Sequence, residues 1–306
     1  GIRAEVEAKT AAPGSTTVNC KTLRDTLRGL KASEVALSHD EKTLSISAGA
    51  TKITLPTLPA DEYPALPDST TTEGLAELNI PADHLREAIR RTLPAASTDE
   101  TLAILTGLLL EQRERTLRLV ATDTYHLHVV TLERSGDCGD DWSAIIPARA
   151  LKLVGQLLPK KYKDDVTLTF GEQQVAMCWP GRRIVTRLIQ GQYWNYQRVI
   201  PGNAESRTPA QVGSFTVDRD AQIDALKVAA PIALSEAGKI ILTPRSDAVE
   251  VTAKGYPDSQ ISQDVPAIGQ GGIKQAYNVD YLLDALNACG EGEVTFKQHG
   301  EISPFL

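Results

Sequence analysis

An internal repeat of about 130 residues limits what this chain can fold into more than any other feature of its sequence. Three segments begin with an apolar residue that leads into an amphipathic helix, and they start at Val18, Ile146 and Tyr277. The strand expected after each helix recurs at nearly the same spacing. Repeated copies of one unit of helices and strands indicate a symmetric scaffold, whose function depends on what it surrounds or stacks against.

A second motif belongs to each full copy of the repeat. Residues 78–89 and 215–226 each read as a short strand, a turn and a helix, and no such segment precedes Val18. Three whole copies need roughly 390 residues, whereas the sequence has 306. We therefore expect an incomplete first copy and a missing C-terminal tail, and an intact mass well above 33.0 kDa would support this expectation.

The periodicity of apolar residues predicts an α+β fold. Alternation between two faces predicts strands within residues 43–47, 117–120, 166–170 and 249–252. Apolar stripes with helical spacing predict helices within residues 20–31, 82–93, 148–163, 218–228 and 279–288. Helices that cover one face of antiparallel sheets give a layered unit, repeated along the chain.

Length and composition fit a folded protein of two or three domains. The chain has 306 residues, of which 42% are hydrophobic, which is enough for each domain to bury a core. Turn-forming residues gather near 67–73 and 201–209. These joints divide the chain into domains at residues 1–70, 71–209 and 210–306.

The cysteines and the apolar runs point to the cytoplasm. Cys20, Cys138, Cys178 and Cys289 show no Cys-x-x-Cys spacing, which argues against a zinc site or a disulfide framework. The longest apolar runs are far shorter than a membrane span. We therefore expect free thiols, no membrane contact and a cytoplasmic location.

Charge is unevenly distributed along the chain. The net charge of −7 ordinarily argues against a nucleic-acid ligand. Residues 20–31 and 82–93 are nevertheless net positive, and residues 148–163 contain lysine and arginine but no carboxylate. An acidic body with basic helices can hold a polyanion against its helical surface and repel it elsewhere. The alternative interpretation is that these are ordinary solvated helix faces.

Four segments of the sequence resemble segments of the bacterial DNA polymerase III beta subunit family, the replicative sliding clamps. They occur in the same order as in that family, at residues 55–67, 121–127, 187–201 and 278–286. The resemblance implies three clamp domains per chain and a head-to-tail homodimer that closes as a ring around duplex DNA. It also implies a protein with no catalytic activity and no cofactor, because such a ring works by topology. Its implied partners are the replicative polymerase alpha subunit, the clamp loader and other proteins with clamp-binding motifs.

The resemblance implies a DNA-facing inner wall made of helices. Contacts with phosphates suit this wall because they carry no sequence information, and tight base contacts would stop the ring from sliding. The candidate residues are Arg24, Arg28, Arg86, Arg90, Arg91, Arg149 and Lys152.

The resemblance further implies a pocket between the second and third domains that binds short linear motifs. Apolar walls with a few polar groups suit an extended peptide with leucine or phenylalanine anchors. The chain departs from the family pattern at Thr124, His126 and Trp194, where the family has Gly, Arg and Pro. The matching positions are Leu105, Thr122, Thr124, Tyr125, His126, Leu127, Trp194, Arg198, Val199, Asn278, Tyr281, Ile302 and Pro304.

A third surface implied by the resemblance closes the ring. Ile53 and Leu55, on an edge strand of the first domain, are expected to meet the region of Ala233 and Leu234 in the third domain of a partner chain. Such a contact joins two different surfaces and closes because two copies complete a full circle.

Two other functions remain open at this stage. Asp123, His126 and His128 place a carboxylate and two imidazoles within six residues, which would suit a metal-dependent hydrolase, but no third strong ligand is indicated nearby. No phosphate-binding, nucleophile-elbow or zinc-protease motif occurs. The second alternative is a diverged clamp-like scaffold that has lost DNA or partner binding, as Trp194 and His126 would allow.

Overall fold

The structure is a computed structural model that describes residues 1–40, 42–63, 76–134, 140–300 and 303. The chain separates into two compact units. The first unit consists of Gly1–Glu73 with Pro180–Arg182, and the second consists of Gly74–Trp179 with Arg183–Leu306. Within the described residues, no helix is long and apolar enough to cross a membrane.

The first unit places one helix, α1 (Cys20–Gly29), against short antiparallel strands. Asn19 caps this helix because its side-chain oxygen accepts a hydrogen bond from the backbone N–H of Thr22. A small core forms around the buried side chains of Leu44, Ile46 and Leu55. Four strands pair in the order β2-β5-β4-β3. The other elements are β1 (Ile2–Ala4), β2 (Thr17–Val18), β3 (Ala36–His39), β4 (Thr43–Ala48), β5 (Thr51–Leu58) and η1 (Ala60–Glu62).

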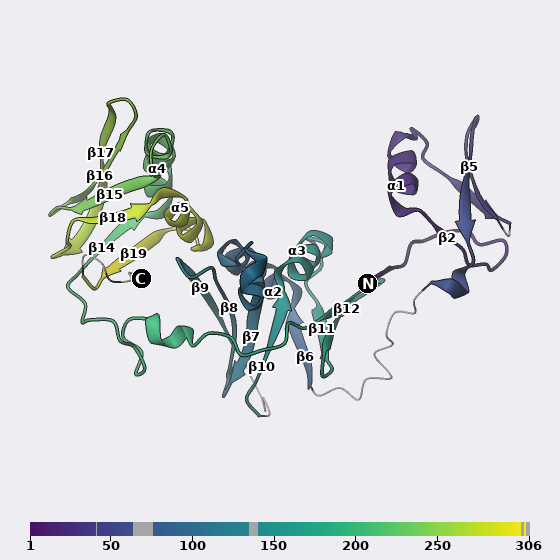
Figure 1. The fold of residues 1–306 in the computed structure, drawn as a ribbon, viewed down its shortest axis with the longest axis horizontal. Coiled ribbons are helices and arrows are strands. Elements are labelled where there is room, and N and C mark those ends of the chain that lie inside the picture. Colours follow the sequence, from purple (N-terminus) through teal and green to yellow (C-terminus); the bar gives the residue numbers. More distant parts are fainter. Residues whose placement is uncertain (41, 64–75, 135–139, 301–302, 304–306) are drawn as a thin grey trace. The chain divides into compact units, whose positions relative to one another are not determined.

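The central region of the second unit, residues 76–209, has two antiparallel sheets under two helices (Figure 1). One sheet has the order β10-β7-β8-β9, and the strands β13-β12-β11-β6 follow one another in the other. The elements are β6 (Ala76–Pro81), α2 (Ala82–Thr92), η2 (Leu93–Ala95), η3 (Glu100–Thr106), β7 (Gly107–Arg113), β8 (Thr116–Thr122), β9 (Leu127–Glu133), β10 (Trp142–Pro147), α3 (Ala148–Leu157), β11 (Asp165–Phe170), β12 (Gln174–Trp179), β13 (Arg182–Arg187) and η4 (Tyr196–Val199).

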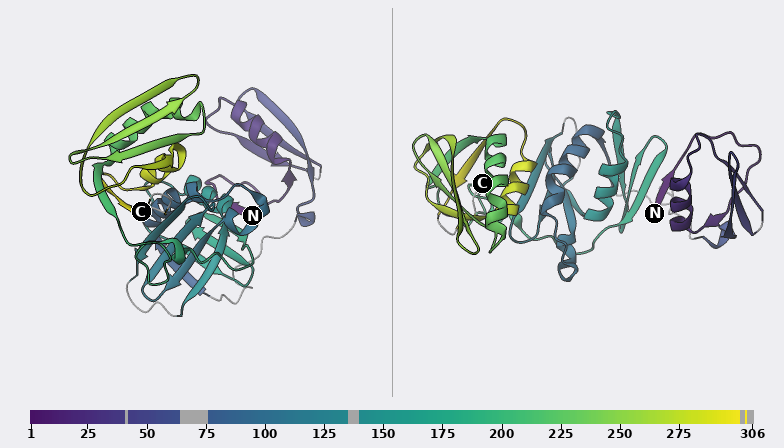
Figure 2. Two further views of the ribbon diagram at one scale, coloured as in Figure 1. Left: turned by 60° about the vertical axis from the view of Figure 1, so that its left-hand side comes forward. Right: turned by 90° about the horizontal axis from the view of Figure 1, so that it is seen from above.

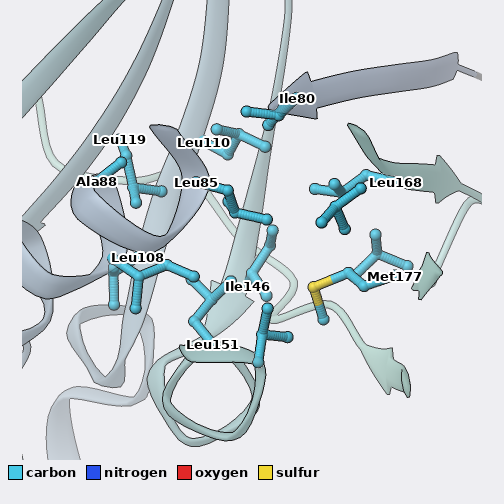
Figure 3. Packing of buried hydrophobic residues seen from close by; sticks show 14 of the residues in the cluster. Ile80, Leu85, Ala88, Leu108, Leu110, Leu119, Ile146, Leu151, Leu168 and Met177 are labelled. Atoms are coloured by element: carbon cyan, nitrogen blue, oxygen red, sulfur yellow. The ribbon is translucent and has the colours of Figure 1, made fainter. Parts of the chain in front are cut away.

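Apolar side chains from both sheets and both helices form one core in this region (Figure 3). Leu85 and Ala88 point inward from α2, Leu151 does so from α3, and Leu168 and Met177 meet them from the strands. Pro81 and Pro147 immediately precede the two helices, at a position where proline has no helical hydrogen bond to lose. The hydrophobic spacing of the sequence therefore becomes the buried face of each helix.

The C-terminal region of the second unit, residues 210–300, also has two helices but only one sheet, of six strands. The strand order is β18-β15-β16-β17-β14-β19. Asp218 and Asn278 cap its two helices through their side-chain oxygens. The elements are β14 (Gly213–Asp218), α4 (Arg219–Leu234), β15 (Lys239–Pro244), β16 (Ala248–Gly255), β17 (Ser259–Gln270), β18 (Gln275–Asn278), α5 (Val279–Ala288) and β19 (Glu293–Gln298).

Four helices of the second unit lie in a row. Helix α2 packs against α3 on one side and α5 on the other, and α5 packs against α4. The view from above shows this row in the order α4, α5, α2, α3 (Figure 2). The two regions of the unit therefore share one continuous helical surface.

The α+β prediction is confirmed, and all five predicted helices are present. Helix α3 ends at Leu157, however, so the prediction was wrong for Lys160, Lys161 and Lys163, which lie beyond it. Pro159 explains this end, because proline disfavours helical backbone in the residue before it. The predicted joint at 201–209 has no helix or strand, and the joint at 67–73 lies outside the described residues.

Candidate functional site

Three aromatic rings meet where the loop between β8 and β9 reaches α5. The ring of Tyr125 stacks with that of Tyr281, with centroids 5.9 Å apart and planes 17° apart. The imidazole of His126 stacks with the same Tyr281 ring, with centroids 4.6 Å apart and planes 20° apart. Tyr125 is 79% exposed, so an aromatic surface faces solvent here. The structure thus brings together three of the residues predicted for the partner pocket.

Asp123 fixes the conformation of this loop. Its Oδ1 accepts hydrogen bonds from the backbone N–H groups of Tyr125 and His126, each at 2.9 Å, and lies 2.8 Å from Nδ1 of His126. Burial raises the pKa of the Asp123 carboxyl, but the two backbone N–H groups and the imidazole lower it further, so the pKa lies below its ordinary value. The carboxylate is therefore ionised at neutral pH and available to orient the imidazole.

The two threonines of the loop complete the turn. The hydroxyl of Thr122 donates to the carbonyl oxygen of His126 at 2.7 Å and accepts from the backbone N–H of Thr124 at 3.1 Å. Thr124 has a φ of 84°, in the left-handed region that glycine adopts most easily. The family has glycine at this position, and Thr124 keeps the left-handed backbone conformation that suits glycine.

His128 is turned away from the loop carboxylate. Its Nδ1 lies 2.7 Å from the carbonyl oxygen of Arg91, and its ring meets His126 edge-on at 5.2 Å. Burial lowers the pKa of His128, which favours the neutral imidazole. Within the part of the chain that the structure describes, no group of three or more His, Cys, Asp or Glu side chains is arranged to hold a metal ion.

Asn278 contributes to the site through the backbone of α5. Its side-chain oxygen accepts hydrogen bonds from the backbone N–H groups of Asp280 at 2.9 Å and Tyr281 at 3.3 Å. This cap sets where the helix begins and hence where Tyr281 projects.

Leu105 and Leu127 belong to a small apolar cluster of the central region. Leu105 is only 1% exposed and packs with Leu109, Val120 and Tyr193, and Leu127 packs against the same cluster. Leu105 is therefore a core residue of this cluster and presents almost no surface to a ligand. Tyr193 belongs to the segment 187–201 that carries the family resemblance but was not among the predicted pocket residues; burial raises its pKa to about 12.

The segment 194–199 carries three more of the predicted residues. Trp194 is 50% exposed and lines a groove of about 1010 Å³ that also contains Glu111, Arg113 and Arg118. Val199 is half exposed, and Arg198 lies beside it in η4. Ile302 and Pro304 lie outside the described residues, as does Cys138, whereas Cys20, Cys178 and Cys289 are free thiols.

The residues predicted to face DNA lie on α1, α2 and α3, but several already have protein partners. Arg86 donates to the carbonyl oxygens of Pro159 and Tyr162. Arg90 and Arg91 both pair with Glu87. Arg24 pairs with its neighbour Asp25. The remaining candidates, which are exposed, are Arg28, Arg149 and Lys152.

The residues predicted for the contact between chains differ in exposure. Ala233 is fully buried in the core of the C-terminal region, whereas the neighbouring Leu234 is half exposed. Leu55 is buried in the core of the first unit, and Ile53 packs against that core. On one side, residues 51–56 of β5 pair with β4. On the other side, β2 pairs with Thr57 and Leu58 of β5 and not with the part that contains Ile53 and Leu55.

The sequence matches two family models that describe parts of one protein. The N-terminal domain of the DNA polymerase III beta subunit matches residues 1–67, and its central domain matches residues 79–195. Together the two matches span more than half of the chain. The chain belongs to the bacterial DNA polymerase III beta subunit family.

Named relatives of this beta subunit are sliding clamps. The Beta sliding clamp of Synechococcus elongatus is 28% identical over 313 residues, which cover 100% of this chain and 80% of that protein. The Beta sliding clamp of Staphylococcus aureus is 28% identical over 289 residues, covering 92% of this chain and 73% of that protein. The chain is accordingly a processivity clamp and not an enzyme.

Solved structures of the family share its fold. The sliding clamp of Pseudomonas aeruginosa, crystallised with griselimycin bound, has a TM-score of 0.86 and 26% identity, covering 97% of this chain and 78% of that one. The beta subunit of Thermotoga maritima has a TM-score of 0.87 and 21% identity, covering 99% of this chain and 80% of that one, and supports the fold alone.

Proposed function

We propose that this beta subunit encircles duplex DNA as a head-to-tail homodimer and tethers replication proteins through a peptide-binding site at the β8–β9 loop. The observation that carries the site is the stacking of Tyr125 and His126 with Tyr281. These rings join two regions of the second unit and leave an exposed aromatic surface. Aromatic surfaces beside a few polar groups suit an extended peptide with apolar anchors.

The proposed peptide ligands are the clamp-binding motifs of the replicative polymerase alpha subunit, of the clamp loader and of other replication or repair proteins. The pocket would extend from the aromatic rings along Thr122 and Leu127 toward Arg198 and Val199. The domain division 1–70, 71–209 and 210–306 and the cytoplasmic location belong to the same proposal.

The proposed DNA contact lies on the row of helices and on α1. Arg149 and Lys152 are exposed on α3, and Arg28 is exposed on α1. Asp280 and Asp284 give α5 a negative charge instead. The proposed phosphate contacts are therefore concentrated on α1 and α3, and they need only be weak because a closed ring is retained by topology.

Two measurements test these proposals. A fluorescent peptide of the form Gln-x-x-Leu-x-Phe is titrated with the wild-type protein and with Tyr281→Ala. We expect micromolar binding that weakens by about tenfold, as the loss of an aromatic contact of about 1.4 kcal/mol predicts. Absence of binding to the wild-type protein would contradict the peptide site.

The ring is tested separately on circular and linearised plasmid DNA. Protein loaded on a circle is expected to stay bound at a salt concentration that removes it from the linear form, because a ring leaves a linear molecule by sliding off its end. Equal loss from both forms would contradict encirclement. Arg149→Ala and Lys152→Ala are expected to lower the salt dependence of DNA binding without changing peptide affinity.

A further inference from the structure

The Tyr281 ring is held through a chain of contacts that starts at a carboxylate. Oδ1 of Asp123 lies 2.8 Å from Nδ1 of His126, and the imidazole lies parallel to the Tyr281 ring with centroids 4.6 Å apart. The side chains of both Asp123 and His126 are largely buried. A partner carboxylate fixes the rotation of an imidazole ring, and a partly dry environment strengthens that hydrogen bond.

This arrangement makes the orientation of Tyr281 depend on two residues outside its own helix. The cap from Asn278 fixes where α5 begins but leaves the phenol ring free to change its side-chain torsions. The stacked imidazole removes that freedom, because a parallel contact at this distance is lost when either ring turns. Both residues sit in the β8–β9 loop, whose turn Asp123 also holds through two backbone N–H groups.

We propose that Asp123 and His126 are positioning residues that hold the Tyr281 ring ready for the partner peptide. Asp123 orients the imidazole, and the imidazole orients the phenol ring before the peptide binds. Preorganisation of this kind raises affinity because the free site has already lost the disorder that binding would otherwise remove. The inference rests on the proposed peptide site, and it gives the departure from arginine to histidine at residue 126 a specific role.

The first measurement is peptide affinity in single and paired variants. We expect His126→Ala and Asp123→Ala each to weaken binding by about three- to tenfold, the range that an aromatic contact supplies. His126→Phe restores a flat ring but lacks the Nδ1 that Asp123 holds, so it is expected to recover only part of the affinity. In a Tyr281→Ala background, His126→Ala is not expected to weaken binding further, because the two residues act through the same pair of rings.

A matched control and an independent readout keep the test decisive. His84→Ala, an exposed histidine on α2, is expected to leave peptide affinity unchanged. In the NMR spectrum, the His126 ring protons are expected upfield because Tyr281 stacks on them, and Asp123→Ala is expected to reduce that shift. Full additivity of His126→Ala with Tyr281→Ala, or an unchanged shift in Asp123→Ala, would overturn the inference.

The two readouts distinguish failure of the proposed peptide site from failure of the positioning role of Asp123 and His126. If the wild-type protein bound no clamp-motif peptide, the peptide site would be rejected, yet the NMR shift would still show whether Asp123 positions the two rings. A normal melting temperature for each variant would confirm that altered affinity does not come from unfolding.

Discussion

Arg90 on α2 donates a hydrogen bond to the main-chain carbonyl oxygen of Asn287 at the end of α5, with an Nη1 to oxygen distance of 2.7 Å. The last carbonyl groups of a helix lack partners within it and carry partial negative charge, so a guanidinium is a favourable partner there. The bond joins the central and C-terminal regions of the second unit at the opposite end of α5 from Tyr281. This hydrogen bond predicts that the guanidinium of Arg90 on α2 also stabilises the end of α5.

Arg90→Ala is expected to loosen the end of α5. The variant loses a charge-assisted hydrogen bond, whose loss typically costs about 1.5–3 kcal/mol. Amide hydrogen exchange of residues 285–289 should accelerate. Arg86→Ala removes the same charge from α2. The Arg86 side chain bonds Pro159 and Tyr162 within the central region, so its loss should not change exchange in α5. Equal effects of the two variants would show that charge, and not the bond to Asn287, is responsible.

The ionised Glu87 side chain is expected to make the wild type more stable than Glu87→Gln, and this difference should disappear in acid. Hydrogen bonds from Arg90, followed by those from Arg91, lower the pKa of Glu87 to about 2 from an ordinary value of 4.5. Because the folded-state pKa is depressed, this stabilisation is present above about pH 4.5 and is lost as the pH falls toward 2. Glu87 is partly exposed, so the effect is screened by solvent.

The check for Glu87 is urea unfolding of the wild type and Glu87→Gln across that pH range. Glu87→Gln should be the less stable protein at pH 7, and the gap between the two should narrow toward pH 2. A gap that is independent of pH would rule out the proposed origin in the ionised carboxylate.

Tyr125 is expected to act through its ring and not through its hydroxyl. The ring is exposed and stacked with Tyr281, and no hydrogen bond of its hydroxyl is needed for this contact. Tyr125→Phe should therefore bind the clamp-motif peptide as well as the wild type, whereas Tyr125→Ala should lose about three- to tenfold in affinity. Fluorescence anisotropy gives both values, and an equal loss in the two variants would assign the role to the hydroxyl.

Gln298 is expected to be a large single contributor to the stability of the C-terminal region. Its fully buried amide donates to the carbonyl oxygen of Ile273 at 2.9 Å and accepts from the backbone N–H of the same residue at 2.9 Å. Gln298→Leu leaves the two partly buried backbone groups of Ile273 without these partners, which should cost about 1–3 kcal/mol. Lys297→Leu, an exposed change on the same strand, should stay within about 0.5 kcal/mol. Thermal unfolding compares the two, and similar melting temperatures would contradict the expectation.

Two leucines of α3 provide a test of the core in Figure 3. Leu151 is buried against both sheets, and Leu157 is more than a third exposed on the same helix. Leu151→Ala should cost about 2–5 kcal/mol because it leaves a cavity, and Leu157→Ala should cost less than about 1 kcal/mol. Denaturant titration of both variants measures these differences. Comparable losses would mean that Leu157 is covered in solution.

The α+β fold was predictable because its determinants are local in the sequence. The apolar stripe of Leu85 and Ile89 and the alternation within β11 and β16 depend on residues only a few positions apart. Prolines at 81 and 147 marked where helices begin for the same reason. The length of α4 was underestimated, because Pro231 lies inside the helix, where proline is expected to stop it.

The candidate site was predictable only in part. The resemblance named Tyr125, His126 and Tyr281, but the role of Asp123 as the anchor of the turn was missed. The Thr-Asp-Thr pattern at 122–124 contained that signal, because Asp commonly accepts hydrogen bonds from the backbone two and three residues later.

By itself the sequence determined the repeat, the helices and strands, and the family to which the chain belongs. Only the tertiary structure decided which charges are free and which rings touch. Arg90 and Arg91 share Glu87, Arg90 also reaches Asn287, and His126 stacks on Tyr281. The contacts with Asn287 and Tyr281 join segments far apart in the chain, so they depend on how whole elements pack, and no periodicity within one segment encodes them.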